Sequence, residues 1–289
     1  MLPDAGQPQG WRTLNDSIVY NIPVTMVAAY RGRDLIVRSH DPSEMVQRLN
    51  IEDMARISYL QILGTGGDID SLMHWDHPVP VDLVVQYPEA DLPLLYRYSP
   101  LLAERPVRVS VPVAAGFSKV VKLALSLNFA VKLEVSQPEP ALIEELLQVA
   151  TLYLHQSTVS QPVEFIHSIF LGFYNRNPVT LWAIQEEDPA LIRYVTDQGA
   201  EILSQRFAGV ELKYGVTSFI KEFTEELLSE KQECCDCGFF KNCSGYFKWP
   251  RKEYRCDGVK SIFQRLKDAA DELRADLASF HTPKGEDRS

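Results

Sequence analysis

Hydrophobic and polar positions divide most of this chain into short apolar runs and longer amphipathic stretches. Runs such as Val81–Tyr87 and Val107–Val113 are short and rich in valine, which predicts β-strands. The stretches between such runs, for example Phe117–Leu127 and Pro140–His155, repeat apolar residues at helical spacing. Alternation of strands with helices of this length predicts an α/β protein built on a parallel sheet.

The same reasoning, applied along the whole chain, gives the following elements. Strands are predicted at Ile18–Tyr30, Val81–Tyr87, Val107–Val113, Ala130–Val135 and Val179–Ile184. Helices are predicted at Ser43–Leu63, Leu92–Glu104, Phe117–Leu127, Pro140–His155, Val163–Tyr174, Pro189–Gln198, Thr217–Ser229 and Gly258–Phe280. We expect a partial, open TIM-like barrel, because the eight units of a complete barrel typically need about 250 residues.

Four regions follow from this pattern. Residues 1–16 and 281–289 are polar and poor in apolar side chains, so we expect two disordered tails. Residues 17–215 carry the strand–helix units of the partial barrel. Residues 216–280 form a small cysteine-rich module that ends in a long helix. The continuous apolar stripe of that helix predicts that it braces the module against the barrel.

Charge and hydropathy narrow the classes of function. The formal net charge is -10, which disfavours sequence-independent binding of nucleic acid because phosphates would be repelled. No apolar run approaches the roughly 18 residues of a membrane span. The first residues also lack the basic and then apolar order of a signal peptide. We therefore expect a cytoplasmic protein that binds neither membrane nor nucleic acid.

Cysteine usage is the most unusual feature of the sequence. Residues 1–233 contain no cysteine, whereas residues 234–256 contain all five. Disulfides suit oxidising compartments, while dense cysteines in a cytosolic chain more often bind metal. The cluster therefore predicts a metal site.

The spacing of these cysteines suggests which metal is bound. Cys234 and Cys237 can close a tight turn that directs two thiolates at one centre, and Cys243 and Cys256 complete a set of four. Four thiolates without histidine suit a 4Fe-4S cluster or a tetrahedral zinc ion. Nearby aromatic and basic residues favour the cluster, although both centres carry a net charge of about -2. Cys235 is either a spare thiol or a replacement for Cys234.

At these residues the chain resembles the SPASM domain, the C-terminal module of radical S-adenosylmethionine enzymes that mature peptides and proteins. Cys234, Cys237 and Cys243 match the first three cysteines of the family motif CxxCxxxxxCxxxC, and Cys256 matches its last, separate cysteine. Phe247 stands in place of the fourth. In the family, the four matching positions hold the second auxiliary 4Fe-4S cluster. The resemblance thus implies one retained cluster site and one deleted site.

Residues 17–215 are similar, less specifically, to the partial barrel of radical S-adenosylmethionine enzymes. The CxxxCxxC motif of the catalytic cluster is missing, because no cysteine precedes Cys234. The resemblance implies a stand-alone SPASM-domain protein that does not itself initiate radicals. Its expected role is that of an accessory electron-transfer or docking protein, with a radical S-adenosylmethionine enzyme or its peptide substrate as partner.

Two other functions remain open from the sequence. The first is a zinc-stabilised scaffold or peptide-binding module without a redox role. The second is an enzyme whose site lies at the barrel mouth and whose metal is purely structural. For the second, Glu186, Glu187 and Asp188 follow the predicted strand Val179–Ile184, at the strand end where barrel sites gather. A solvated loop is the other interpretation of these three acids.

Overall fold

One sheet organises the protein in the computed structural model, which describes residues 17–210, 212–230 and 233–281. The two predicted tails, residues 1–16 and 281–289, lie outside these residues except for His281. Within the described residues the sheet has nine strands. They are β1 (Val19–Pro23), β2 (Asp34–Ser39), β3 (Ile57–Leu63), β4 (Val81–Val84), β5 (Val107–Pro112), β6 (Ala130–Glu134), β7 (Val163–Glu164), β8 (Ile192–Val195) and β9 (Glu201–Ile202).

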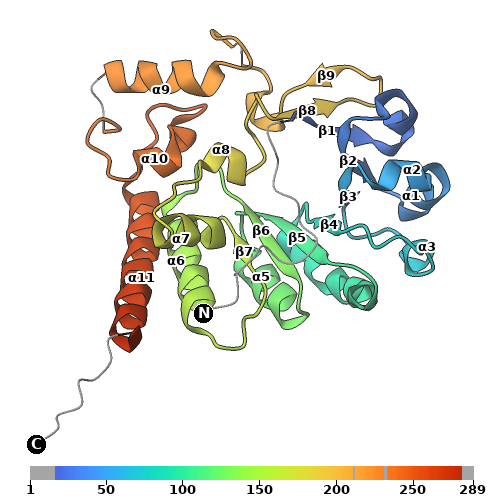
Figure 1. Ribbon diagram of the computed structural model, residues 1–289, viewed down its shortest axis with the longest axis horizontal. Coiled ribbons are helices and arrows are strands. Elements are labelled where there is room, and N and C mark those ends of the chain that lie inside the picture. The colour runs from blue at the N-terminus through green and yellow to red at the C-terminus, as the bar shows by residue number, and fades with distance from the viewer. Residues whose placement is uncertain (1–16, 211, 231–232, 282–289) are drawn as a thin grey trace, which may run out of the picture.

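The strand order is β7-β6-β5-β4-β3-β2-β1-β8-β9, so β7 and β9 form the two edges. All neighbouring strands are parallel except β8 and β9. In Figure 1 the strands follow a curved path, and most of the helices lie on the convex side. The predicted α/β class with a parallel sheet is confirmed.

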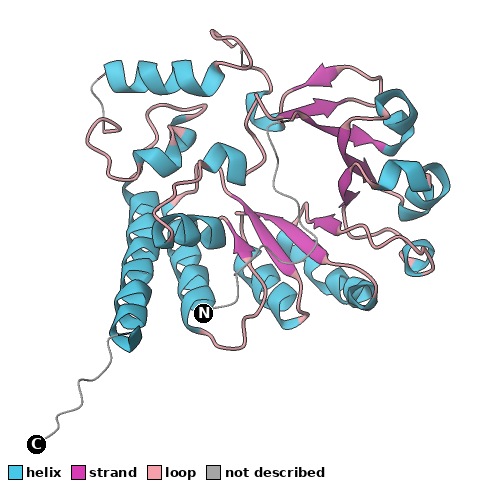
Figure 2. Ribbon diagram, viewed as in Figure 1, coloured by secondary structure: helices cyan, strands magenta, loops and turns pink. Residues whose placement is uncertain are grey.

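Helices connect most of the strands (Figure 2). The α-helices are α1 (Pro42–Arg48), α2 (Ile51–Met54), α3 (Asp70–Met73), α4 (Pro88–Asp91), α5 (Phe117–Ser126), α6 (Pro140–His155), α7 (Ile166–Tyr174), α8 (Leu181–Ile184), α9 (Phe219–Ser229), α10 (Phe240–Cys243) and α11 (Asp257–His281). Four 3-10 helices are η1 (Val24–Tyr30), η2 (Leu92–Ala103), η3 (Gln205–Phe207) and η4 (Tyr246–Lys248). The predicted helix Pro140–His155 matches α6, whose first residue is a proline, as is common at that position.

Several predicted elements are wrong in whole or in part, including the second half of the predicted strand Ile18–Tyr30, which is the 3-10 helix η1. The predicted helix Ser43–Leu63 ends at Met54 and is followed by β3, while β2 was not predicted at all. The predicted strand Val179–Ile184 is instead the helix α8, which begins where the Thr180 side chain accepts a hydrogen bond from the backbone N–H of Ala183. The predicted helix Pro189–Gln198 contains β8, which pairs with β1. Short apolar runs fit either element, and sheet pairing decided between them.

The two faces of the sheet differ in character. The face toward the helices is apolar and contributes Val81, Leu83, Val109 and Val131 to the main core, where each side chain is buried. The opposite face carries a smaller apolar cluster around Tyr59 and a row of polar side chains. The curved sheet therefore has one conventional core face and one largely polar face.

The long helix α11 packs against α6 and α7 and thereby joins the cysteine-bearing segment to the helices that cover the sheet. Its buried residues Val259, Ile262, Phe263 and Leu266 belong to the same core as the strands. The predicted long C-terminal helix is confirmed. None of the helices in the described part of the chain has the length and hydrophobicity needed to cross a membrane.

Candidate functional site

The four cysteines predicted as metal ligands lie around one small cavity. Cys234, Cys237, Cys243 and Cys256 all contribute to its wall. None of them is in a disulfide. They come from a turn before α10, from the end of α10 and from the residue before α11. The fold therefore brings together thiols that are up to 22 positions apart in sequence (256 minus 234).

Local hydrogen bonds position each cysteine. The backbone N–H of Cys237 donates to the carbonyl of Cys234 at 3.4 Å, which closes the first turn. The N–H of Cys243 donates to the carbonyl of Phe239 at 3.0 Å within α10. The carbonyl of Cys256 accepts from the N–H of Lys260 at 2.8 Å, so Cys256 caps the N-terminus of α11. A helix N-terminus favours negative charge, such as that of a thiolate.

The surroundings of the thiols are mainly apolar. Side chains of Phe240, Phe247, Val259 and Phe263 complete most of the cavity wall. Burial raises the pKa of the Cys243 thiol to about 12. Burial also raises the pKa of Cys234 and that of Cys256. Such thiols are protonated at neutral pH, and a bound metal ion would displace these protons.

Two lysines provide positive charge at the cavity. Lys248 and Lys260 both line it and both form ion pairs with Glu233, the second at 2.8 Å between Nζ and Oε2. Burial alone would raise the pKa of Glu233, but the hydrogen bonds from the two lysines outweigh it and lower the pKa to about 2. The cavity therefore has a charged rim on one side, suited to an anionic centre.

Cys235 differs from its neighbours. Its side chain is exposed, it does not line the cavity, and its thiol donates to the carbonyl of Leu228 at 3.1 Å. Cys234 is buried and lines the cavity instead. The structure thus places Cys234, rather than Cys235, with Cys237, Cys243 and Cys256.

The thiols share a cavity without forming a complete coordination shell. Among the described residues, no group of three or more histidine, cysteine, aspartate or glutamate side chains is arranged to hold a metal ion. Binding of one metal centre by the four thiols would therefore need their side chains to move closer together.

The cysteine-bearing segment is attached to the carboxyl end of β6. The Gln137 side chain donates to the carbonyls of Phe247 and Arg251, each at 2.8 Å. The Tyr246 hydroxyl donates to the carbonyl of Val135 at 2.8 Å, and the Tyr254 hydroxyl donates to that of Pro138 at 2.9 Å. These bonds fix the segment to the loop that leads from the sheet into α6.

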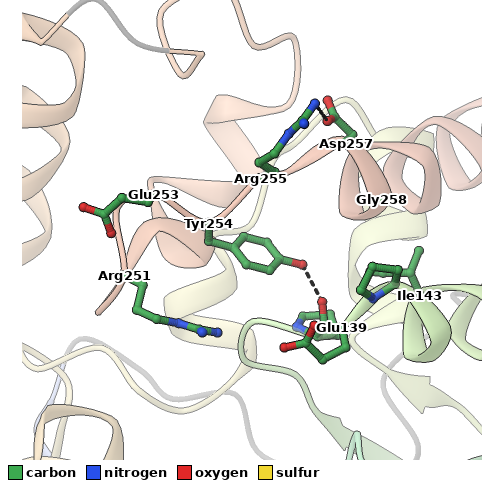
Figure 3. Close-up of a pocket in the computed structure, with 10 residues that line it drawn as sticks. Glu139, Ile143, Arg251, Glu253, Tyr254, Arg255, Asp257 and Gly258 are labelled. Atoms are coloured by element: carbon green, nitrogen blue, oxygen red, sulfur yellow. Dashed lines mark hydrogen bonds and ion pairs between the residues drawn. The ribbon is translucent and has the colours of Figure 1, made fainter.

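An open groove of about 580 Å³ runs beside Cys256. Figure 3 shows the ring of Tyr254 in this groove, with Arg251 on one side and Glu139 and Ile143 on the other. Arg255 and Asp257, which flank Cys256 in sequence, also line the groove, whereas Cys256 itself lines the cysteine cavity. The groove and the cysteine cavity therefore lie on residues that are adjacent in sequence at the start of α11.

Gly245 provides a test of how tightly this segment packs. Its φ is +73°, and an added Cβ would lie 2.6 Å from Leu227 Cδ1 and 3.2 Å from Phe223 Cε1. We expect Gly245→Ala to lower the free energy of unfolding by about 1–3 kcal/mol more than Gly209→Ala, through overpacking. Gly209 is a matched control, since its φ is +71° and a Cβ there meets nothing within 4 Å. Urea denaturation measures both, and equal losses would contradict tight packing at Gly245.

Charged side chains on the polar face of the sheet form a second cluster. Gln61, Asp82 and Arg108 occupy paired positions on β3, β4 and β5. Arg108 donates two hydrogen bonds of 3.1 Å to the Asp82 carboxylate, one from Nε and one from the terminal nitrogen Nη2. The Ser110 hydroxyl donates to the same carboxylate at 2.8 Å. Asp82 and Ser110 are fully buried, so this is an interior network rather than a solvated surface.

Glu186 links this network to the chain that follows α8. Its carboxylate lies 2.5 Å from Lys132 Nζ and 3.5 Å from Arg108 Nη1, and it accepts a hydrogen bond of 2.7 Å from the Tyr59 hydroxyl. Burial alone would raise the pKa of Glu186, but Lys132 and Arg108 outweigh it and lower the pKa to about 2. The sequence left two interpretations of Glu186, Glu187 and Asp188, a site at the barrel mouth or a solvated loop. The solvated loop is wrong for Glu186.

The backbone at Glu186 is unusual as well. Its φ is +58°, its N–H donates to the carbonyl of Ala183, and the N–H of Glu187 donates to that of Trp182. This pair of bonds is the Schellman ending of a helix, in which the left-handed position is usually glycine. A side chain there costs roughly 1–2 kcal/mol. The ion pairs of the carboxylate offset that cost.

The sequence contained a signal for this network. In the runs VDLVV, VRVSV and AVKLE, single polar residues stand between apolar ones. Because successive side chains of a strand point to opposite faces, the polar residues of each run lie on one face of its strand. The prediction described these runs only as short, apolar strands. The strand period places the polar residues of each run on one face, and the pairing of β4 with β5 and of β5 with β6 brings Asp82, Arg108, Ser110 and Lys132 together.

No family model matches the sequence, and a comparison with curated proteins finds no match.

Proposed function

We propose that Cys234, Cys237, Cys243 and Cys256 hold one metal centre, a 4Fe-4S cluster, and that the protein is an accessory electron-transfer or docking protein. The observation that carries this proposal is that all four thiols line one cavity while Cys235 does not. Four soft thiolate ligands without histidine suit an iron-sulfur cluster. Such a cluster would supply one-electron chemistry.

The surroundings of the thiols support a cluster. Apolar walls from Phe240, Phe247 and Phe263 would limit contact with water. Lys248, Lys260 and the N-terminus of α11 would stabilise its negative charge. In this proposal residues 216–280 are a SPASM-like module and the curved sheet is a partial TIM-like barrel.

The accessory role follows from what the sequence lacks. No cysteine precedes Cys234, so the chain has no CxxxCxxC motif with which to start radical chemistry. The expected partner is a radical S-adenosylmethionine enzyme or its peptide substrate. The groove beside Cys256, lined by Tyr254, Arg251 and Ile143, supports the docking part of this role, because it is open to solvent next to the proposed cluster.

A zinc-stabilised scaffold or peptide-binding module is the second candidate. Four thiols around a small cavity also suit tetrahedral zinc, and the same lysines would balance its charge. In this case the metal would stabilise the segment that carries the cysteines and would take no part in redox chemistry.

Metal analysis separates the two candidates. The protein would be purified without oxygen, and iron, sulfide and zinc would be measured per chain together with the visible absorbance. The cluster predicts about four iron and four sulfide per chain and a broad visible absorbance. Zinc near one per chain with no visible absorbance would exclude the redox function, and absence of both metals would exclude the metal centre.

A further inference from the structure

The guanidinium of Arg251 is held in a fixed direction at the groove beside Cys256. The side-chain oxygen of Gln137, a buried residue, accepts a hydrogen bond of 2.9 Å from Arg251 Nε. The amide nitrogen of Gln137 donates to the carbonyl of Arg251 at 2.8 Å, so one side chain binds both the backbone and the side chain of this arginine. The fold has therefore already restricted an arginine that would otherwise lose more side-chain freedom on binding a ligand.

The outer edge of this guanidinium is open to a ligand. An arginine has five N–H donors, and the bond to Gln137 uses only the one on Nε. Among the residues that the structure describes, no carboxylate lies within ion-pair distance of Arg251. Water satisfies the remaining donors in the free protein, so the evidence for a site is their fixed direction at a groove. Donors of this geometry match the two oxygens of a carboxylate.

The groove next to this guanidinium has a rigid apolar surface. Tyr254 lies in it, and the Tyr254 hydroxyl donates to the carbonyl of Pro138 at 2.9 Å (Figure 3). The ring of Tyr254 also stacks on that of Phe247, with 6.3 Å between their centroids. Pro138, Pro140 and Ile143 line the groove as well. Because these rings are already fixed, an apolar side chain can be buried against them with little further ordering of the protein.

Acidic residues on the same groove limit what can bind. Glu139 and Glu253 line it, and Arg255 is already paired with Asp257 at 2.9 Å. A nucleic acid or a chain of phosphates would bring several negative charges close to these carboxylates and would be repelled. A ligand with one carboxylate beside an apolar group pairs with Arg251 without adding further negative charge.

We propose that the groove binds an extended peptide segment in which an acidic side chain stands next to an apolar one. The acidic side chain pairs with Arg251, and the apolar side chain lies against Tyr254 and Ile143. The inference rests on the docking part of the proposed function and specifies its ligand, whichever metal the cysteines hold. Neighbouring residues at the start of α11 line the groove and the cysteine cavity, so a bound segment lies near the proposed metal centre.

Isothermal titration calorimetry on the full chain tests the proposal with three short peptides whose ends are blocked and uncharged. The first has one glutamate between two leucines, and in the other two a glutamine or a lysine replaces the glutamate. The glutamate peptide is expected to bind about tenfold more tightly than the glutamine peptide, because only the carboxylate forms a charge-assisted pair with the guanidinium. The lysine peptide is expected to bind more weakly still.

Arg251→Lys separates the fixed guanidinium from its charge. A lysine keeps the charge but cannot form the two-point pair with a carboxylate, so this variant should bind the glutamate peptide about tenfold more weakly. Arg48→Lys on α1 is the matched control, because Arg48 is also exposed and its Nε also donates a hydrogen bond of 2.9 Å to a side-chain oxygen, that of Glu44. It should bind as the unmodified protein does.

Four results would overturn the proposal. They are no binding of the glutamate peptide, equal or tighter binding of the glutamine or lysine peptide, unchanged binding by Arg251→Lys, or equal weakening by Arg48→Lys. Circular dichroism shows whether both variants have folded. Failure of the metal centre is detected separately, because the iron, sulfide and zinc analysis does not depend on peptide binding.

Discussion

Replacing Cys243 with serine is expected to reduce the metal content of the protein from about one centre per chain to background. Cys243 is at the end of α10 and lines the cavity with Cys234, Cys237 and Cys256. Serine is a poor ligand for the soft metals that thiolates bind, so the loss of one of four ligands should remove the centre. Iron, sulfide and zinc analysis after anaerobic purification provides the measurement.

Cys235→Ser is the control for this experiment. Cys235 is next to a proposed ligand in sequence, yet it is exposed and does not line the cavity. The Cys235 variant should therefore keep its full metal content. Equal metal loss in both variants, or full retention in the Cys243 variant, would refute the proposed ligand set. Circular dichroism of both variants shows whether each has folded.

Glu186→Gln is expected to lower the free energy of unfolding by about 3 kcal/mol at neutral pH, because it leaves Lys132 and Arg108 without the acid that pairs with them. Urea denaturation measures this loss. Glu144→Gln on the exposed side of α6 is the control and should change stability by less than about 0.5 kcal/mol. Similar losses in both variants would show that the Glu186 ion pairs add no stability.

The difference in stability between the unmodified protein and Glu186→Gln is also expected to depend on pH. The pKa of Glu186 is about 2 in the folded protein, below its ordinary value of 4.5. A carboxyl group whose pKa is lower in the folded than in the unfolded protein stabilises the fold. This stabilisation is complete when the pH is above the ordinary pKa and is lost as the pH falls through the pKa of the folded protein. The stability difference between the unmodified protein and Glu186→Gln should therefore shrink from pH 4.5 toward pH 2. A difference that stays constant over this range would contradict the ion pairs.

Local periodicity was sufficient to predict much of the fold from the sequence. The helices α5 and α6 and the strands β5 and β6 are long and regular enough for their apolar spacing to identify them. The clustering of five cysteines within residues 234–256 likewise identified the segment in which four thiols share a cavity. These features depend on residues that are close together in the chain.

The tertiary structure alone decided the features that depend on distant residues. The strand β8 exists because it pairs with β1, and its own short apolar run fits a helix equally well. Glu186 is 127 positions from Tyr59 and 54 from Lys132, so no local pattern could join them. Cys235 and Cys234 are adjacent in sequence, and only the packing of the turn shows which thiol faces the cavity. Local spacing determines which element a segment forms, whereas the burial and pairing of polar groups are determined by contacts that exist only after the chain has folded.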